Sequence, residues 1–216
     1  MCSHYEAPGR QQLLDIFGLE PEADYKLDLF PGSTGVMIRN QPRLNDKGEL
    51  EAEAVAGVFG LLPFWAKDEK LARRTYNARS ETVAELPSFR SAWKQSRHCI
   101  IPAAAIYEPD WRSGKAKPAR IWRKDGKPLG IAGIWESWRN PEDPNGAEVL
   151  SYSMLTINAD DHELLRNYHK PDSEKRMVVI LPAGAYRDWL KATPAESLDF
   201  LRQYPADRLQ AETLER

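Results

Sequence analysis

Apolar positions along the chain follow two periods, and each period predicts one type of element. Leucine, isoleucine and phenylalanine recur with helical spacing over residues 11–19, and Gly18 closes this stretch, so a short helix is expected there. Asp160 with Glu163 has the form of a capping box and predicts a helix that runs toward Tyr168. Two later segments also predict helices: Ala183–Lys191 and Ala195–Gln203.

Strands are predicted where β-branched and apolar residues gather between Gly, Pro and Asn. In chain order, the predicted strands are Val36–Arg39, Ala54–Leu62, Ala119–Arg123, Leu129–Trp138, Val149–Asn158 and Met177–Leu181. Asp125-Gly126 is a turn signal, and it predicts that the two strands beside it pair as a hairpin. Cys99–Tyr107 is also apolar, with Pro102 interrupting it.

The pattern contains no internal repeat, low-complexity tract or linker, so residues 1–216 are expected to form a single domain. Runs of strands with a few helices, and no regular alternation of the two, are typical of the α+β class. We therefore predict a mainly antiparallel, barrel-like β-sheet flanked by helices.

Composition narrows the setting in which this domain works. Hydrophobic residues make up 42% and charged residues 29%, as in ordinary globular proteins. The longest apolar run, Val58 to Ala66, contains Pro63 and is too short to span a bilayer, and the N-terminus lacks a signal-peptide pattern. The only cysteines are Cys2 and Cys99, which is no disulfide framework. We expect a cytoplasmic, monomeric protein without a membrane partner.

Charge is unevenly distributed. The net charge is −2, which argues against a generally basic nucleic-acid binder. Between Lys67 and Lys127, however, 15 Lys/Arg face 7 Asp/Glu, a local excess of 8 positive charges that leaves −10 for the rest. This segment fits either a negatively charged partner or a solvated basic face. The Cys and His spacings form no zinc motif, and neither a metal nor another cofactor is expected.

The second residue is a cysteine, and it would become the mature N-terminus if Met1 were removed. An N-terminal cysteine carries an amine with a pKa near 8 and a thiol with a pKa of about 8.5 on adjacent carbons. Together they can capture an aldehyde, because the amine forms an imine and the thiol then closes a thiazolidine ring. Position alone favours the alternative, a cysteine without a chemical role on a frayed terminus.

Three further segments carry chemically active side chains. Asn77 and Arg79 are two residues apart, so on a strand they would share a face; a polar loop with a salt bridge is the alternative. Glu108 ends an apolar run, where burial could bring a carboxyl group into the general acid/base range, although glutamates also end strands without a function. His169 precedes a proline and could titrate near neutrality or simply cap a helix.

Taken together, these segments resemble the SOS response-associated peptidase (SRAP) family, which shields abasic sites in single-stranded DNA by covalent cross-linking. The order and spacing of the matching segments carry the resemblance. They are Met1-Cys2 with Tyr5, Gly60–Lys67, Asn77–Thr82, Cys99–Pro102 leading into Tyr107-Glu108, and His169 followed by Arg176-Met177 and Val179–Leu181.

The resemblance implies a reaction at Cys2, whose amine and thiol would condense with the open-chain aldehyde of an abasic site. Glu108 would assist proton transfer near the amine. His169 would act as acid/base for ring opening and imine formation. Asn77 would hydrogen-bond near the terminal cysteine and the sugar, and Arg79 would hold a flanking phosphate.

The same resemblance implies that the protein binds unpaired DNA. Single strands are held by basic groups along the backbone and by aromatic faces under the bases. Trp65, with Phe64 beside it, is the expected base platform, with core packing of Trp65 as the alternative. Arg176 and His4 are expected to contact phosphates. Bound to DNA, the protein would be associated with the nucleoid.

Three features depart from the family pattern. Ser3-His4 replaces the usual Gly-Arg, so a permanently charged donor is lost. Pro109 follows Glu108, where many relatives have a tryptophan. The stretch from His169 to Arg176 is longer than the compact arrangement of some members.

Two other functions remain compatible with the sequence. One is a cysteine peptidase with Cys2 as nucleophile and His169 as base, whose activity could be confined to removal of its own Met1. The other is a non-catalytic single-stranded nucleic-acid-binding module that uses the basic segment and its aromatic residues.

Overall fold

Two β-sheets form the framework of the computed structural model, which describes residues 2–45, 47–48, 50–143 and 145–215. The larger sheet contains eight strands: β3 (Thr34–Leu44), β4 (Leu50–Phe59), β5 (Asn77–Arg79), β6 (His98–Ala103), β9 (Leu129–Trp138), β10 (Val149–Asn158), β11 (Arg176–Val178) and β12 (Ile180–Leu181). The smaller sheet contains five: β1 (Tyr5–Glu6), β2 (Asp28–Leu29), β7 (Ala105–Asp110), β8 (Lys117–Arg123) and β13 (Leu209–Thr213).

Helices are short and lie around these sheets. The α-helices are α1 (Arg10–Phe17), α2 (Arg90–Lys94) and α3 (Tyr186–Lys191). The 3-10 helices are η1 (Glu69–Arg74), η2 (Leu165–Asn167), η3 (Ala183–Ala185), η4 (Glu196–Phe200) and η5 (Ala206–Arg208). No helix in the described ranges is long and apolar enough to cross a membrane.

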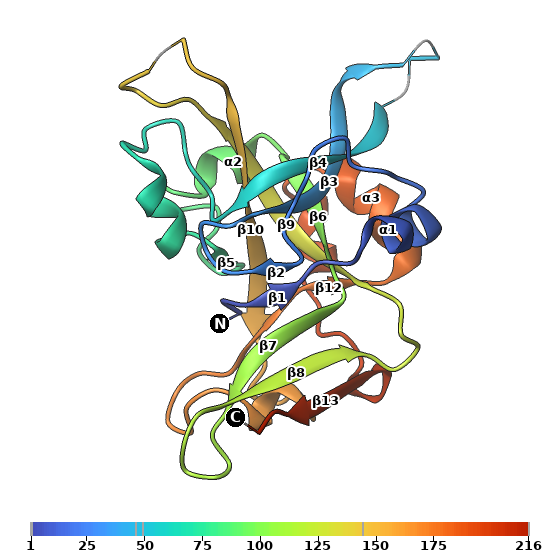
Figure 1. Cartoon of the computed structure of the whole chain (residues 1–216), viewed down its shortest axis with the longest axis vertical. Coiled ribbons are helices and arrows are strands. Elements are labelled where there is room, and N and C mark those ends of the chain that lie inside the picture. Colours follow the sequence, from blue (N-terminus) through green and yellow to red (C-terminus); the bar gives the residue numbers. More distant parts are fainter. Residues whose placement is uncertain (1, 46, 49, 144, 216) are drawn as a thin grey trace.

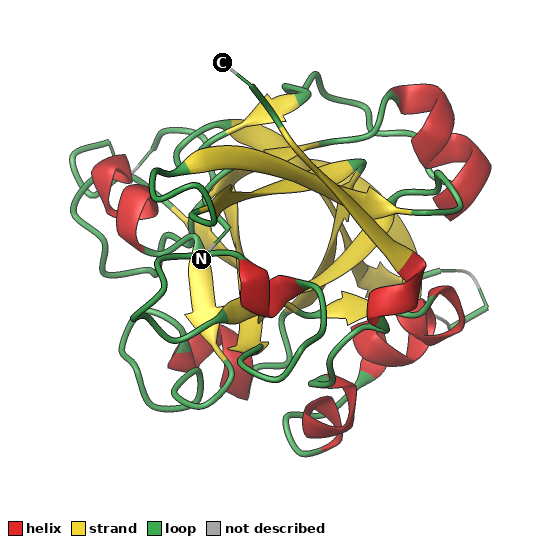
Figure 2. Ribbon diagram, turned by 90° about the horizontal axis from the view of Figure 1, so that it is seen from below, coloured by secondary structure: helices red, strands yellow, loops and turns green. Residues whose placement is uncertain are grey.

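The larger sheet closes on itself. Its strands pair in the order β10, β4, β3, β6 and β9, and β9 pairs back to β10. Figure 2 looks into the resulting ring of strands. All of these pairings are antiparallel except that of β10 with β4, so the predicted barrel-like, mainly antiparallel α+β fold is confirmed.

The smaller sheet lies at one end of the barrel, below it in Figure 1. The chain passes from barrel to smaller sheet between β6 and β7, where the Ala104 N–H donates to the Glu6 carbonyl at 2.7 Å. β1 pairs antiparallel with β7, with Tyr5 opposite Ile106. The N-terminus is therefore built into a sheet, with β2 on its other side.

The helix expected at residues 11–19 is confirmed as α1, and Gly18 ends it with a φ of 70° and an N–H bond to the Leu14 carbonyl. A helix is also confirmed within Ala183–Lys191, as η3 followed by α3. Ala195–Gln203 forms only the 3-10 helix η4, at whose start Thr193 and Glu196 bond reciprocally to each other's backbone N–H groups. The Met177–Leu181 strand is divided at Val179 into β11 on β10 and β12 on β9.

The predicted hairpin across Asp125-Gly126 is wrong. β8 pairs with β7 and β13, whereas β9 pairs with β6, β10 and β12. The turn itself exists: Gly126 has a φ of 72° and donates to the Arg123 carbonyl at 3.0 Å. This turn carries the chain from one sheet to the other. Its residues alone do not show whether the strands on either side pair with each other.

The predicted helix from Asp160 toward Tyr168 is also wrong, apart from the three-residue η2. The Asp160 carboxylate accepts the Lys175 N–H at 2.8 Å and the Asn158 side chain at 2.8 Å, so it caps nothing. His162 takes the capping role instead, since its Nδ1 accepts the Leu165 N–H at 3.0 Å.

Gly60 shows how tightly the barrel packs against the segment that follows it. Its φ is 122°, a conformation that other residues rarely adopt, and its N–H donates to the Tyr152 carbonyl at 2.8 Å. A Cβ at this position would collide with the carbonyl group of Ala72. Both backbone conformation and space therefore require glycine.

We predict that Gly60→Ala lowers the free energy of unfolding by about 3 kcal/mol or more, through backbone strain and overpacking. Gly184→Ala is the matched control, since nothing lies within 4 Å of its added Cβ and its φ is ordinary. It should change stability by about 0.5 kcal/mol at most. Urea denaturation of both variants tests this, and equal midpoints would contradict it.

Candidate functional site

Cys2 lies in the interior although it is the second residue of the chain. Its side chain is 1% exposed. The Tyr107 N–H on β7 donates to the His4 carbonyl at 3.0 Å, and this same carbonyl receives the Cys2 Sγ at 3.4 Å. Pairing with β7 therefore draws the start of the chain inward and orients the thiol.

Asn77 holds the backbone of Cys2. It lies on β5, which runs parallel to β10 with Asn77 opposite Met154. Its Nδ2 donates to the Cys2 carbonyl at 2.8 Å. Its Oδ1 is buried and accepts no hydrogen bond from the described part of the chain. The amide thus fixes the position of the cysteine and keeps one acceptor for a further group.

The Glu108 carboxylate and the His169 imidazole lie against each other in this interior. The Glu108 Oε2 lies 2.7 Å from the His169 Nε2, and the two side chains are 1% and 8% exposed. The His169 N–H donates to the Pro109 carbonyl at 2.8 Å, and His169 has a φ of 66°, which is uncommon for a residue with a side chain. Bonding to the strand that carries Glu108 keeps the two groups together.

Comparison with known proteins identifies the family of the chain. The sequence pattern of the SOS response-associated peptidase (SRAP) family matches residues 1–216. The chain belongs to the SRAP family.

This SRAP chain is similar to curated and solved relatives over most of its length. It is 36% identical over 197 residues to "Abasic site processing protein YoqW" of Bacillus subtilis, covering 88% of the chain and 80% of the relative. It is 31% identical to YoaM of the same organism, covering 92% and 84%. A crystal structure of a Bordetella bronchiseptica protein superposes with a TM-score of 0.87, at 49% identity and full coverage of both chains.

Electrostatics favour a neutral thiol in this SRAP protein. Burial raises the pKa of Cys2, and the negative charge of Glu108 raises it further. Burial likewise raises the pKa of Tyr76, with contributions from Cys2 and Glu108. Tyr76 therefore lies beside the same groups, although the sequence analysis did not select it. Its position next to Asn77 in a polar cluster was the available signal.

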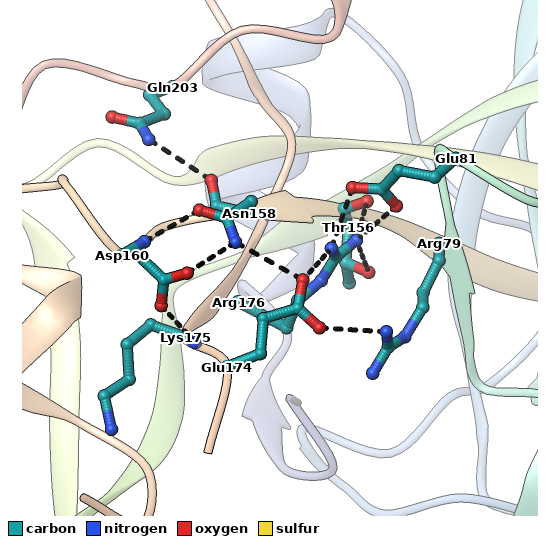
Figure 3. Close-up of polar contacts among 9 residues, drawn as sticks. All are labelled: Arg79, Glu81, Thr156, Asn158, Asp160, Glu174, Lys175, Arg176 and Gln203. Carbon is teal, nitrogen blue, oxygen red and sulfur yellow. Dashed lines mark hydrogen bonds and ion pairs between the residues drawn. The ribbon is translucent and has the colours of Figure 1, made fainter. Parts of the chain in front are cut away.

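Arg79 and Arg176, two expected phosphate contacts, come together at one end of β5 (Figure 3). The Arg79 side chain is 47% exposed, and its Nη1 donates to Glu174 at 2.9 Å. The Arg176 side chain is only 3% exposed and bonds to Glu81 and Glu174. Arg176 thus stabilises the fold locally, whereas Arg79 has a face open to solvent.

Phe64 and Trp65 follow β4 on the surface. Their exposed fractions are 71% and 44%. Trp65 is therefore not packed in the core, which was the alternative to a base platform. Trp65 lines a surface hollow with Lys67, Lys70 and Arg74. Aromatic and basic side chains therefore adjoin there, as a binding surface for single strands requires.

His4 lies apart from these basic groups. Its ring is stacked between Phe30 and Tyr107, at centroid distances of 4.2 and 4.0 Å, and its Nε2 lies 2.5 Å from the Asp28 Oδ1. No group of three or more His, Cys, Asp or Glu side chains in the described ranges is placed to hold a metal ion.

We predict that Glu108→Gln increases alkylation of Cys2 by iodoacetamide. Removing the carboxylate charge lowers the thiol pKa, so the reactive thiolate fraction rises at any pH below that pKa. At about pH 8 the rate should rise about threefold to tenfold, on the scale of one pKa unit or less. Mass mapping of labelled Cys2 measures this. Glu85→Gln, at an exposed position, is the control; no difference between the variants would contradict the prediction.

Proposed function

We propose that this protein recognises abasic sites in single-stranded DNA and bonds to them covalently through Cys2 once Met1 is removed. Relatives named abasic site processing proteins support the substrate class. The observation that carries the proposal is the arrangement around Cys2, whose backbone is bound by Asn77 beside the Glu108–His169 pair. Met1 itself lies outside the described residues.

The reaction needs no cofactor. The free α-amine of Cys2 adds to the aldehyde carbon of the open sugar, and a proton moves from nitrogen to oxygen to give a carbinolamine. Loss of one water then gives an imine. The Cys2 sulfur adds to the imine carbon, its proton passes to the nitrogen, and a thiazolidine ring results. One water is released overall.

The raised pKa of the Cys2 thiol determines the order of these reaction steps. A neutral thiol is a weak nucleophile toward an aldehyde, so the amine acts first. An imine that takes up a proton is a stronger electrophile than the aldehyde, and the thiol can then add while it gives up its own proton. Burial of the sulfur is therefore compatible with ring closure as the second step.

Glu108 and His169 are proposed to move the protons. A carboxylate and an imidazole 2.7 Å apart can accept the proton that the amine loses and return it to the departing water. The free Oδ1 of Asn77 offers an acceptor to a sugar hydroxyl. Since all three groups are held by strands or by a bond to β7, the reacting atoms meet in a fixed geometry.

The DNA strand is proposed to bind by its backbone and its bases. Arg79 holds a phosphate near the reacting sugar, and Trp65 with Phe64 supports flanking bases at the exposed surface described above. Arg176 and His4 are not proposed to bind phosphate directly, because the Arg176 terminal nitrogens bond to Glu81 and Glu174 and the His4 Nε2 lies against Asp28.

A general cysteine peptidase is less well supported. Such enzymes use a thiolate activated by a nearby histidine. Here burial and Glu108 oppose the thiolate, and the His169 Nε2 is paired with Glu108. Removal of Met1 by the same groups remains part of the proposal.

We predict that wild-type protein forms an adduct with abasic single-stranded DNA that survives denaturation. Its intact mass should equal protein lacking Met1 plus the oligonucleotide, less one water. Cys2→Ala, isolated without Met1 as verified by intact mass, keeps the α-amine but not the thiol, so its adduct should appear only after borohydride reduction of the imine. Denaturing gels and mass spectrometry measure both.

Two controls make this result decisive. Cys99→Ala removes the other thiol, which is buried, and should still cross-link. An intact strand should give no adduct. Binding of intact and abasic strands without any adduct would indicate a non-covalent module, and turnover of unrelated peptides would indicate a peptidase.

A further inference from the structure

The segment between His169 and β11 places a carboxylate directly on a guanidinium next to the site. Glu174 belongs to this segment, and its Oε2 accepts from the Arg79 Nη1 at 2.9 Å (Figure 3). Arg79 and Asn77 lie two residues apart on β5 and so share a face, separated by about 7 Å along the strand. An anion on Arg79 is therefore close to the group that holds Cys2.

The two oxygens of Glu174 have different partners. Oε1 accepts from the buried Arg176 at 2.7 Å and from the Asn158 side chain at 3.4 Å. Oε2 bonds to Arg79. Arg176 is itself bound at both terminal nitrogens by Glu81, at 2.8 and 2.9 Å. The buried Arg176 guanidinium thus holds Glu174 in place independently of Arg79.

Arg79 differs from Arg176 in being accessible. Its side chain is 47% exposed, against 3% for Arg176, and Glu174 is 36% exposed. A charged pair at such a surface is worth about 1 kcal/mol or less, so an incoming anion can displace it at low cost. The carboxylate stays on Arg176 while the Arg79 guanidinium turns to the new partner.

We propose that Glu174 is a specificity-determining residue that occupies Arg79 in place of a DNA backbone phosphate. This rests on the proposed function, in which Arg79 binds the strand beside the reacting sugar. A carboxylate and a phosphate oxygen bond to a guanidinium in the same way. A ligand must bring an anion to Arg79 to replace Glu174. An aldehyde without a flanking phosphate therefore gains no binding affinity at Arg79.

The test measures binding of a single-stranded oligonucleotide with a central tetrahydrofuran residue, an abasic-site analogue that has no aldehyde and cannot cross-link. Glu174→Gln keeps an amide oxygen for Arg176 and removes the charge facing Arg79. It should tighten binding about threefold to tenfold, by freeing Arg79 and removing a repulsion. Thermal unfolding verifies that the variant is folded.

Asp172→Asn is the matched control, since it removes the same charge from the same segment at an exposed position. It should change affinity less than about twofold, as a remote screened charge does. Equal tightening by both variants would mean a general charge effect and overturn the proposal. Unchanged affinity of Glu174→Gln would overturn it as well.

A neutral methylphosphonate linkage on each side of the abasic analogue removes the competing anion. With this strand, Glu174→Gln should no longer tighten binding, and in an Arg79→Gln background it should have no effect on either strand. Persistence of the effect in both cases would refute the exchange. Loss of cross-linking with a true abasic strand would instead refute the proposed function, because binding is measured here without it.

Discussion

The pairing of β1 with β7 is the constraint on which the site depends. It places Tyr5 opposite Ile106 and brings the His4 carbonyl to the Tyr107 N–H, so the chain before it must turn inward. Cys2 then reaches Asn77 on one side and comes under the charge of Glu108 on the other. A terminus that would otherwise fray becomes as ordered as a core residue.

The barrel, which adjoins the sheet that contains β1 and β7, positions the other site residues around Cys2. β5 is a strand of three residues that pairs with β10, and it carries Asn77 and Arg79 on one face. The loop after η2 bonds to Pro109 and so follows β7. Residues from four separate parts of the sequence are thus positioned by two neighbouring sheets, and none needs a long flexible side chain to reach the others.

Periodicity predicted the class of fold and, within the barrel, most of β4, β9 and β10 and the middle of β3, because half-buried strands leave a strong local pattern. It did not predict the three-residue strand β5. It could not assign β8 and β9 to different sheets, since a turn such as Asp125-Gly126 specifies direction but not partner. The predicted site residues Cys2, Asn77, Glu108 and His169 do come together. The ion pairs of Arg79 and Arg176 and the stacking of His4 depend on distant segments, which no local pattern records.

Because the second residue is buried, the number of residues ahead of β1 is tied to the geometry of the site. In an extended segment, one residue added or lost between Cys2 and Tyr5 would turn alternate side chains to the opposite face. The number of residues between Cys2 and β1 therefore determines which way the Cys2 side chain faces. An initiation site moved by one codon, or an extra residue left ahead of the cysteine, would change the chemistry without altering any side chain of the barrel.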